Sequence, residues 1–122
     1  KLVKKLRKEK INSKIFIQDW ADKIVYKNIN IIINTTSLGL SKHDKLEFDF
    51  SKANKNCLVY DLIYNPVETY FLKQAQQKNL KTYNGLGMLC RQAAESFRMW
   101  FDLEVEEEHI QEIMKKLKKK NK

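Results

Sequence analysis

Polar but uncharged side chains follow apolar runs at three places in the sequence. The first is INTTSLGL (33–40), which offers an asparagine, two threonines and a serine in succession. The second is YNP (64–66), and the third is YNGLG (83–87). Hydroxyl and amide groups donate and accept hydrogen bonds without changing their charge. They therefore predict binding of a polar ligand, and the alternative is that they close turns through local side-chain bonds.

The remaining reactive side chains do not form a catalytic or metal-binding pattern. His43 lies in a polar stretch and His109 in a charged one, and neither has an acid and a nucleophile beside it in sequence. Cys57 and Cys90 are too few for a disulfide framework or a zinc site, which favours a reducing cytoplasm. Asp61 interrupts an apolar run, and we interpret it as a structural carboxylate that must be hydrogen-bonded or lie near a sheet edge.

Residue patterns predict the elements that position these side chains. Strands are expected at 14–20, 30–34, 57–64 and 80–83, and helices at 1–10, 66–79, 86–101 and 104–120. The run at 30–34 is apolar throughout, which predicts burial on both faces. Pro66 suits the first position of its helix. The stretch 41–56 is rich in turn-forming residues and predicts a polar surface connection.

The two last helices carry apolar residues at helical spacing, so each should pack one face against a neighbour. In 86–101 the stripe is Leu89, Ala93, Phe97 and Trp100. In 104–120 it is Val105, Ile110, Ile113, Met114 and Leu117. Acids in the first turns of the last helix and lysines in its last turns suit the helix dipole.

Strands that alternate with helices predict an α/β fold with a parallel sheet. Ligands bind such sheets at the carboxyl ends of the strands, and all three polar stretches fall there. One crevice along this edge is therefore expected. The three glycines, Gly39, Gly85 and Gly87, form no G-x-G-x-x-G loop for a dinucleotide's pyrophosphate.

The charge of the chain is concentrated at its ends. Of the net charge of +9 over 122 residues, six basic residues lie in 1–10 and six in 115–122, whereas 11–114 holds 12 basic and 14 acidic residues. Basic ends can contact nucleic acid, but no base-reading motif accompanies them, and we interpret them as solvated helix ends. No apolar run is long enough to span a membrane.

Three stretches together resemble the shikimate dehydrogenase family. IIINTTSLGL (31–40) is similar to the family's strand ending in N-A-T-S/P-x-G. VYDLIYNP (59–66) is similar to its V-x-D-x-x-Y-x-P block, and NGLGMLCRQAAESFRMWFD (84–102) to its n-G-x-x-M-L-x-x-Q block. The resemblance covers roughly 30 to 115, and Thr35 replaces the more usual alanine.

The resemblance implies roles for eight residues. Tyr64 and Gln92 would contact the substrate. The residues that would border NADP are Asn34, Thr36, Ser37, Leu62, Gly85 and Met88. The fold implied is a partial Rossmann-like domain at 1–84 that lacks the Gly-rich loop. A helical segment at 85–122 would pack on an amino-terminal substrate domain that this chain does not contain.

The same resemblance implies an activity for a longer parent protein. The family's catalytic lysine and aspartate lie in the amino-terminal domain, so no catalytic residue is expected in this chain. The expected function is the carboxyl-terminal part of a cytoplasmic oxidoreductase of aromatic amino-acid biosynthesis. It would transfer a hydride between NADP(H) and shikimate or 3-dehydroshikimate, and the chain alone would be inactive. The apolar helix faces would contact the amino-terminal domain or, as in a homodimer, another copy. Quinate is an alternative substrate, and a non-catalytic module that binds a partner or nucleic acid is an alternative function.

Overall fold

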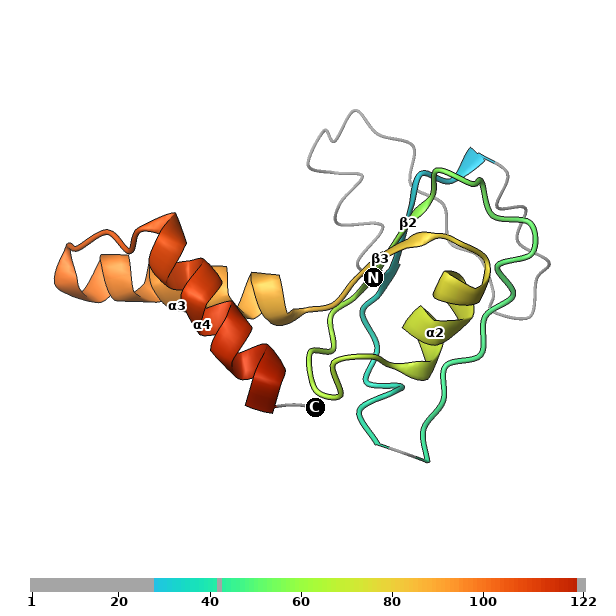
Figure 1. Cartoon of the computed structure of the whole chain (residues 1–122), viewed down its shortest axis with the longest axis horizontal. Helices are drawn as coiled ribbons and strands as arrows, with labels where there is room; N and C mark the ends of the chain where they lie inside the picture. Colours follow the sequence, from blue (N-terminus) through green and yellow to red (C-terminus); the bar gives the residue numbers. More distant parts are fainter. Residues whose placement is uncertain (1–27, 42, 121–122) are drawn as a thin grey trace, which may run out of the picture.

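The computed structural model of the chain describes residues 28–41 and 43–120. The helix expected at 1–10 and the strand expected at 14–20 lie outside these residues. The elements are β1 (Ile31–Asn34), β2 (Leu58–Asp61), α2 (Tyr70–Gln77), β3 (Lys81–Tyr83), α3 (Leu86–Phe101) and α4 (Glu107–Lys120). Figure 1 shows α3 and α4 as a hairpin that extends from the end of β3, away from the sheet and α2.

The three described strands form one parallel sheet in the order β1-β2-β3. This confirms the expected α/β class with a parallel sheet. The register places Ile32 opposite Val59, and Val59 opposite Thr82. Because the strands run in the same direction, their carboxyl ends meet at one edge of the sheet.

The main hydrophobic core lies between the sheet and α2. Val59 is fully buried and is packed with Phe71, Leu72 and Ala75 of α2. The connection at 41–56 also contributes to this core, because Leu46 and Phe50 are only 5% and 3% exposed. The expected surface connection is present, since most of its described residues are exposed, but Leu46 and Phe50 anchor it to the core. Leu46, Phe48 and Phe50 alternate with Glu47 and Asp49, so the sequence does carry a period of two that indicates one buried face, although the segment forms no strand.

Strand β1 is buried on one face rather than on both. Ile32 packs on the core, whereas Ile31 and Ile33 are 55% and 54% exposed. Successive side chains of a strand point to opposite faces. Within the described part of the chain, the core covers only the face to which Ile32 points, so the expectation for this strand was half right.

Helix α2 begins later than its sequence suggests. Thr69 is its N-cap, and the Thr69 side chain accepts a hydrogen bond from the backbone N–H of Leu72. Pro66 is therefore not the first helical residue, and it follows a cis peptide bond with Asn65. A threonine hydroxyl satisfies one of the free N–H groups at a helix start, which favours Thr69 over Pro66 as the boundary.

The α3–α4 hairpin has a small core of its own. Leu86, Cys90 and Ile110 are buried, and Val105, Met114 and Leu117 pack against them. The expected stripe of α4 is thus largely confirmed. The face that α3 buries is displaced from its expected stripe, since Trp100 is 76% exposed.

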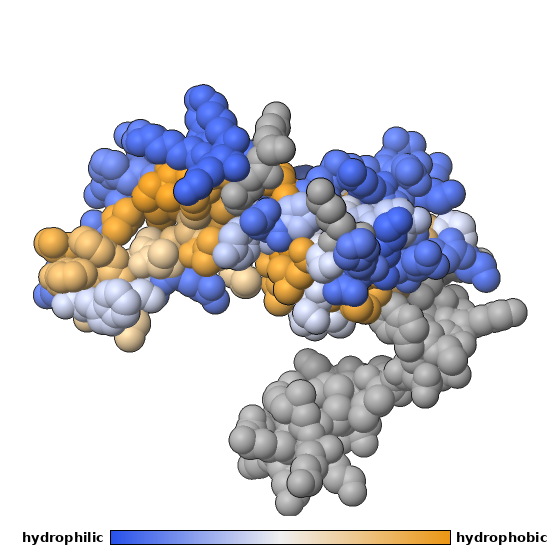
Figure 2. Space-filling view, turned by 90° about the horizontal axis from the view of Figure 1, so that it is seen from below, coloured by the Kyte–Doolittle hydropathy of each residue, from blue (hydrophilic) through white to orange (hydrophobic). Residues whose placement is uncertain are grey.

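The exposed face of α3 forms an apolar surface. It consists of Phe97, Met99, Trp100, Phe101 and the following Leu103. The rings of Phe97 and Phe101 lie 4.7 Å apart between centroids. Figure 2 shows apolar residues reaching the surface at the end of the molecule that the hairpin forms. No helix among the described residues is long and apolar enough to cross a membrane.

Candidate functional site

The three polar stretches lie at one edge of the sheet, as expected. β1 ends at Asn34, β2 ends at Asp61 beside it, and β3 ends at Tyr83. The loops that follow are tied together by backbone hydrogen bonds. Leu62 N donates to Asn34 O at 3.1 Å, and Gly85 N donates to Ile63 O at 3.1 Å. The edge is therefore a connected framework rather than three independent loops.

Asn34 and Thr36 use their side chains to build the turn after β1. Asn34 is 3% exposed, and its Nδ2 donates to the carbonyl oxygen of Leu38 at 3.3 Å. Its Oδ1 accepts hydrogen bonds from Thr36 N at 3.0 Å and from Thr36 Oγ1 at 2.7 Å. Thr36 Oγ1 in turn accepts from Leu38 N. The turn-closing interpretation of these residues therefore describes their geometry, and their role toward a cofactor stays a prediction.

Asp61 is fully buried and hydrogen-bonded, which is one of the two alternatives expected for a structural carboxylate. Its Oδ1 accepts from Asn34 Nδ2 and from Ile63 N, each at 3.1 Å. Its Oδ2 accepts from Thr69 Oγ1 at 2.6 Å. A buried carboxylate is costly unless such donors surround it. Within the described residues no buried side-chain nitrogen or oxygen lacks a hydrogen-bond partner.

Gly85 occupies a place that excludes any side chain. A Cβ atom added there would lie 1.9 Å from the carbonyl oxygen of Leu62. The two backbones therefore approach so closely that only glycine fits, and the backbone angle φ of −72° is ordinary. Asn84 supports the approach, because its Nδ2 donates to Val67 O at 2.8 Å and its Oδ1 accepts from Leu86 N at 3.2 Å. The sequence indicated a turn at this point but not the contact with Leu62.

Tyr64 and Gln92 keep their polar groups free. Tyr64 is 40% exposed, and Gln92 lies exposed on α3. Within the described part of the chain, neither the phenol of Tyr64 nor the side-chain amide of Gln92 has a hydrogen-bond partner. Both groups can therefore bond a ligand without breaking an existing contact. Ser37 is likewise exposed, whereas Leu62 and Met88 are half-buried.

Two open hollows flank this edge, and neither gathers the predicted residues. One of about 500 Å³ lies beside the start of α2, between Gly39, Lys45 and Tyr70. The other, of about 1000 Å³, lies between β3 and the hairpin. Of the eight predicted residues, Met88 alone lines either hollow. The described residues therefore offer one wall of a site rather than an enclosed pocket.

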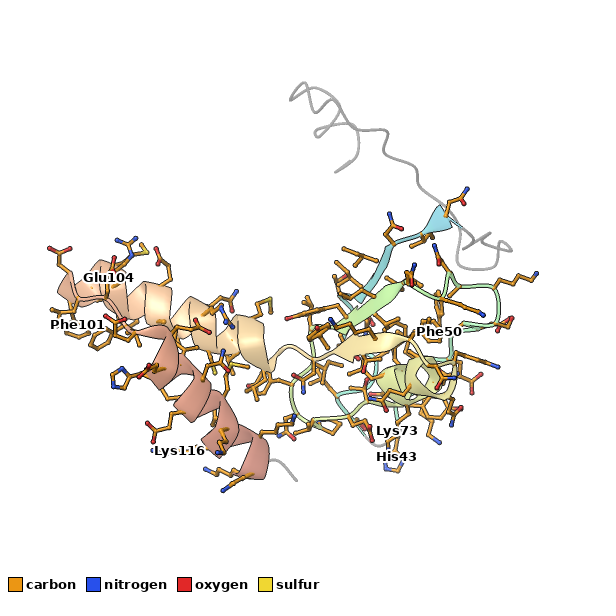
Figure 3. The ribbon with its side chains drawn as sticks, turned by 45° about the horizontal axis from the view of Figure 1, so that its top comes forward. His43, Phe50, Lys73, Phe101, Glu104 and Lys116 are labelled. Carbon is orange, nitrogen blue, oxygen red and sulfur yellow. The ribbon has the colours of Figure 1, made fainter. Side chains whose placement is uncertain are left out.

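The histidines and cysteines lie away from any reactive arrangement. Burial raises the pKa of the Cys57 thiol and of the Cys90 thiol, which disfavours the nucleophilic thiolate. Figure 3 shows His43 and Lys73 at the opposite end of the molecule from Phe101 and Glu104. No group of three or more metal-binding side chains is present in residues 28–41 and 43–120.

The described edge offers apolar and hydrogen-bonding side chains but no loop that would hold a phosphate group. Half-buried Leu62 and Met88 offer apolar contact, and the free groups of Ser37 and Tyr64 offer hydrogen bonds. Pyrophosphate is usually held by a Gly-rich turn at a helix start. The described residues contain no such loop.

Comparison with known proteins identifies a family model and proteins that are similar to this chain. The family model of the shikimate 5'-dehydrogenase C-terminal domain matches residues 85–115. The shikimate dehydrogenase (NADP(+)) of Caldicellulosiruptor saccharolyticus is 41% identical over 111 residues, which are 88% of this chain and 39% of the relative.

Solved structures give the same result for the fold. A shikimate dehydrogenase in complex with NADP+ matches with a TM-score of 0.65 and 38% identity, over 75% of this chain and 32% of that one. The Thermus thermophilus enzyme in complex with NADP(H) and shikimate matches with a TM-score of 0.63 and 28% identity, over 75% of this chain and 35% of that one. The chain spans roughly a third of the length of the relatives that it matches.

Proposed function

We propose that this chain, which is similar to the carboxyl-terminal part of shikimate dehydrogenases, forms that part of an NADP-dependent oxidoreductase. The reaction is the interconversion of shikimate and 3-dehydroshikimate. The observation that carries the proposal is the 41% identity over 88% of the chain to a relative that is named for this activity. The names of the relatives cited above support shikimate and give no support to quinate.

In the proposed enzyme the chain binds and orients rather than transfers protons. The nicotinamide supplies the hydride chemistry when it is bound. Leu62 and Met88 offer it apolar contact, and the turn at Asn34, Thr36 and Ser37 borders it. The free phenol of Tyr64 and the free amide of Gln92 hydrogen-bond hydroxyl groups of the substrate, which suits a polyol acid.

The proposal also assigns a partner to each part of the chain. The two separate cores, one between the sheet and α2 and one within the hairpin, support a division into 1–84 and 85–122. The first part belongs to the cofactor-binding domain. The second packs on an amino-terminal substrate domain of the same protein, and a second copy is the alternative partner. Two buried free cysteines support a cytoplasmic location.

The test joins this chain to the part of a relative that it does not match. The chain alone, supplied with shikimate and NADP, is expected to form no NADPH. Fused behind the amino-terminal portion of the Caldicellulosiruptor saccharolyticus relative, it is expected to form NADPH when shikimate is added. The relative's own two portions, rejoined in the same way, provide the positive control.

Two matched pairs of variants assign the substrate contacts within the fusion. Tyr64→Phe and Gln92→Ala are each expected to raise the KM for shikimate about tenfold, because each removes one hydrogen bond to the substrate. Tyr70→Phe and Gln77→Ala make the same changes at exposed positions of α2 and should leave the KM unchanged. An inactive fusion beside an active control would refute the proposed function.

If the fusion binds shikimate or NADP but forms no NADPH, the non-catalytic alternative is favoured. In that case the basic end of α4, with Lys118, Lys119 and Lys120 in its last turn, is the place to look for a nucleic-acid contact. Such binding would weaken steeply as the salt concentration rises.

A further inference from the structure

The carboxylate of Asp61 connects three segments that meet at the candidate site. It bonds the end of β1 through Asn34, the turn after β2 through Ile63, and the start of α2 through Thr69. We propose that Asp61 is a positioning residue that fixes the relative placement of the residues facing cofactor and substrate. This inference rests on the proposed function for its consequence in catalysis, but its structural content can be tested without any activity.

The first branch from Asp61 reaches the turn after β1. Asn34 Nδ2 donates to Asp61, which leaves Asn34 Oδ1 to accept both the N–H and the hydroxyl of Thr36. The orientation of the Asn34 amide is therefore set by Asp61, because only the Nδ2 side can face a carboxylate. Thr36 then follows the orientation of Asn34.

The second branch holds the turn between Leu62 and Tyr64. The N–H of Ile63 donates to Asp61 Oδ1, and the carbonyl oxygen of Ile63 accepts from Gly85 N. Both polar groups of the Ile63 backbone are thus fixed, the N–H by Asp61 at the end of β2 and the carbonyl oxygen by Gly85 at the start of α3. Leu62 and Tyr64 flank this residue directly, so their directions depend on these two bonds.

The third branch ties the framework to the core. Thr69 is 1% exposed, donates its hydroxyl proton to Asp61 Oδ2 and accepts from Leu72 N. One hydroxyl therefore caps α2 and anchors the carboxylate. The Thr69 methyl group lies 3.6 Å from a Cβ placed on Gly39, so the loop after β1 also packs against this side chain.

The chemistry of the network requires a carboxylate at this position. All three partners of Asp61 present hydrogens to it, and an ionised carboxylate offers acceptors only. Asparagine has the same shape but would place an NH₂ group where one of the acceptors stands. Asp61→Asn therefore keeps the volume of the side chain and removes one acceptor and the negative charge.

The first measurement is amide hydrogen exchange, followed by NMR, on the full 122-residue chain. In Asp61→Asn the amides of Ile63 and Thr36 are expected to exchange about tenfold faster, whereas that of Val59 in the middle of β2 changes little. Asp49→Asn is the matched control, because Asp49 accepts from the amide of Ser51 two residues later in an exposed turn. Equal exchange at Ile63 and Thr36 in Asp61→Asn and wild type would overturn the proposal.

Thr69 supplies a second, milder pair of variants in case Asp61→Asn fails to fold. Thr69→Val keeps the shape and loses the bond to Asp61, whereas Thr69→Ser keeps the bond and loses a methyl group. The proposal requires faster exchange at Ile63 in the valine variant and recovery in the serine variant. If the serine variant behaves like the valine variant, packing rather than the carboxylate network is responsible, and the proposal is wrong.

The consequence for catalysis is measured in the fusion enzyme described above. Thr69→Val is expected to raise the KM for NADP and for shikimate about tenfold with kcat nearly unchanged, and Thr69→Ser should restore both values. A loss of folded protein alone would lower the apparent kcat and leave each KM unchanged, which would contradict positioning. If the wild-type fusion is inactive, the proposed function fails, while the exchange data on the chain still decide the role of Asp61.

Discussion

Two glycines two residues apart illustrate how one missing side chain can matter or not. At Gly85 an added Cβ would lie 1.9 Å from the carbonyl oxygen of Leu62, which is backbone and cannot rotate away. At Gly87 the nearest atoms are the ends of the flexible Met114 and Arg91 side chains, at 3.5 and 3.6 Å. The first glycine therefore holds two strand ends together, and the second is dispensable.

Alanine substitutions test this contrast at the residue scale. Gly85→Ala is expected to lower the free energy of unfolding by about 3 kcal/mol, because the backbones of Leu62 and Gly85 must separate. Gly87→Ala should leave it unchanged or raise it by less than about 1 kcal/mol, since Gly87 lies in the first turn of α3 and alanine has the higher helix propensity. Urea denaturation of both variants measures the difference. Equal stabilities of the two variants would show that packing against Leu62 does not require glycine at position 85.

At the scale of elements, α4 is held to α3 by one face. Ile110 is 7% exposed within the hairpin core, whereas Ile113, three residues later, is 48% exposed. Ile110→Ala is expected to lower the free energy of unfolding by about 2 to 4 kcal/mol through the cavity it leaves. Ile113→Ala, with the same chemistry, should cost less than about 1 kcal/mol. Thermal denaturation monitored by circular dichroism compares the two, and a larger loss at Ile113 would mean that α4 packs by a different face.

The elements also show which parts of the fold a sequence can predict. Helix α3 was predicted with its bounds because its helical period runs uninterrupted from Leu86 to Phe101. The three described strands were placed by short apolar runs that end in turn-forming residues. The start of α2 was misplaced because proline and threonine both mark helix starts; Thr69 caps the helix through Leu72 N, and its hydroxyl also donates a bond to Asp61. That bond joins residues of different elements and has no local signal.

The candidate site was likewise predictable in part, where the sequence carries a local signal, and not where contacts between elements decide. Polar stretches at three strand ends predicted a shared edge, because parallel topology alone brings the ends together. Which side chains of that edge form internal hydrogen bonds and which remain available to a ligand could not be predicted. Asn34 and Tyr64 both suit a ligand in the sequence, yet the Asn34 amide bonds Asp61 and Leu38, whereas the Tyr64 phenol has no hydrogen-bond partner among the described residues.

At the scale of the whole molecule, the hairpin presents an apolar surface, whereas the sheet presents a polar edge. Trp100 is 76% and Met99 71% exposed on α3, together with the paired rings of Phe97 and Phe101. Clustered aromatic residues of this kind usually mark an interface. The hairpin core formed by Leu86, Cys90 and Ile110 does not use this surface. A partner can therefore cover the surface without rearranging the hairpin.

The partner that the proposed function requires is an amino-terminal substrate domain, and one substitution tests it. Trp100→Lys should leave the stability of the chain within about 0.5 kcal/mol, because the indole is exposed. It should weaken binding to the separately produced amino-terminal portion of the Caldicellulosiruptor saccharolyticus relative by about 30-fold, as loss of a central tryptophan does at interfaces. Calorimetric titration measures the affinities of the wild-type chain and of Trp100→Lys for this portion, with Tyr70→Lys on α2 as the control for added charge. Gel filtration of the chain alone tests the alternative partner, a second copy of the chain. If the chain is a dimer and Trp100→Lys dissociates it, the second copy is the partner and the proposed contact with the amino-terminal domain is contradicted.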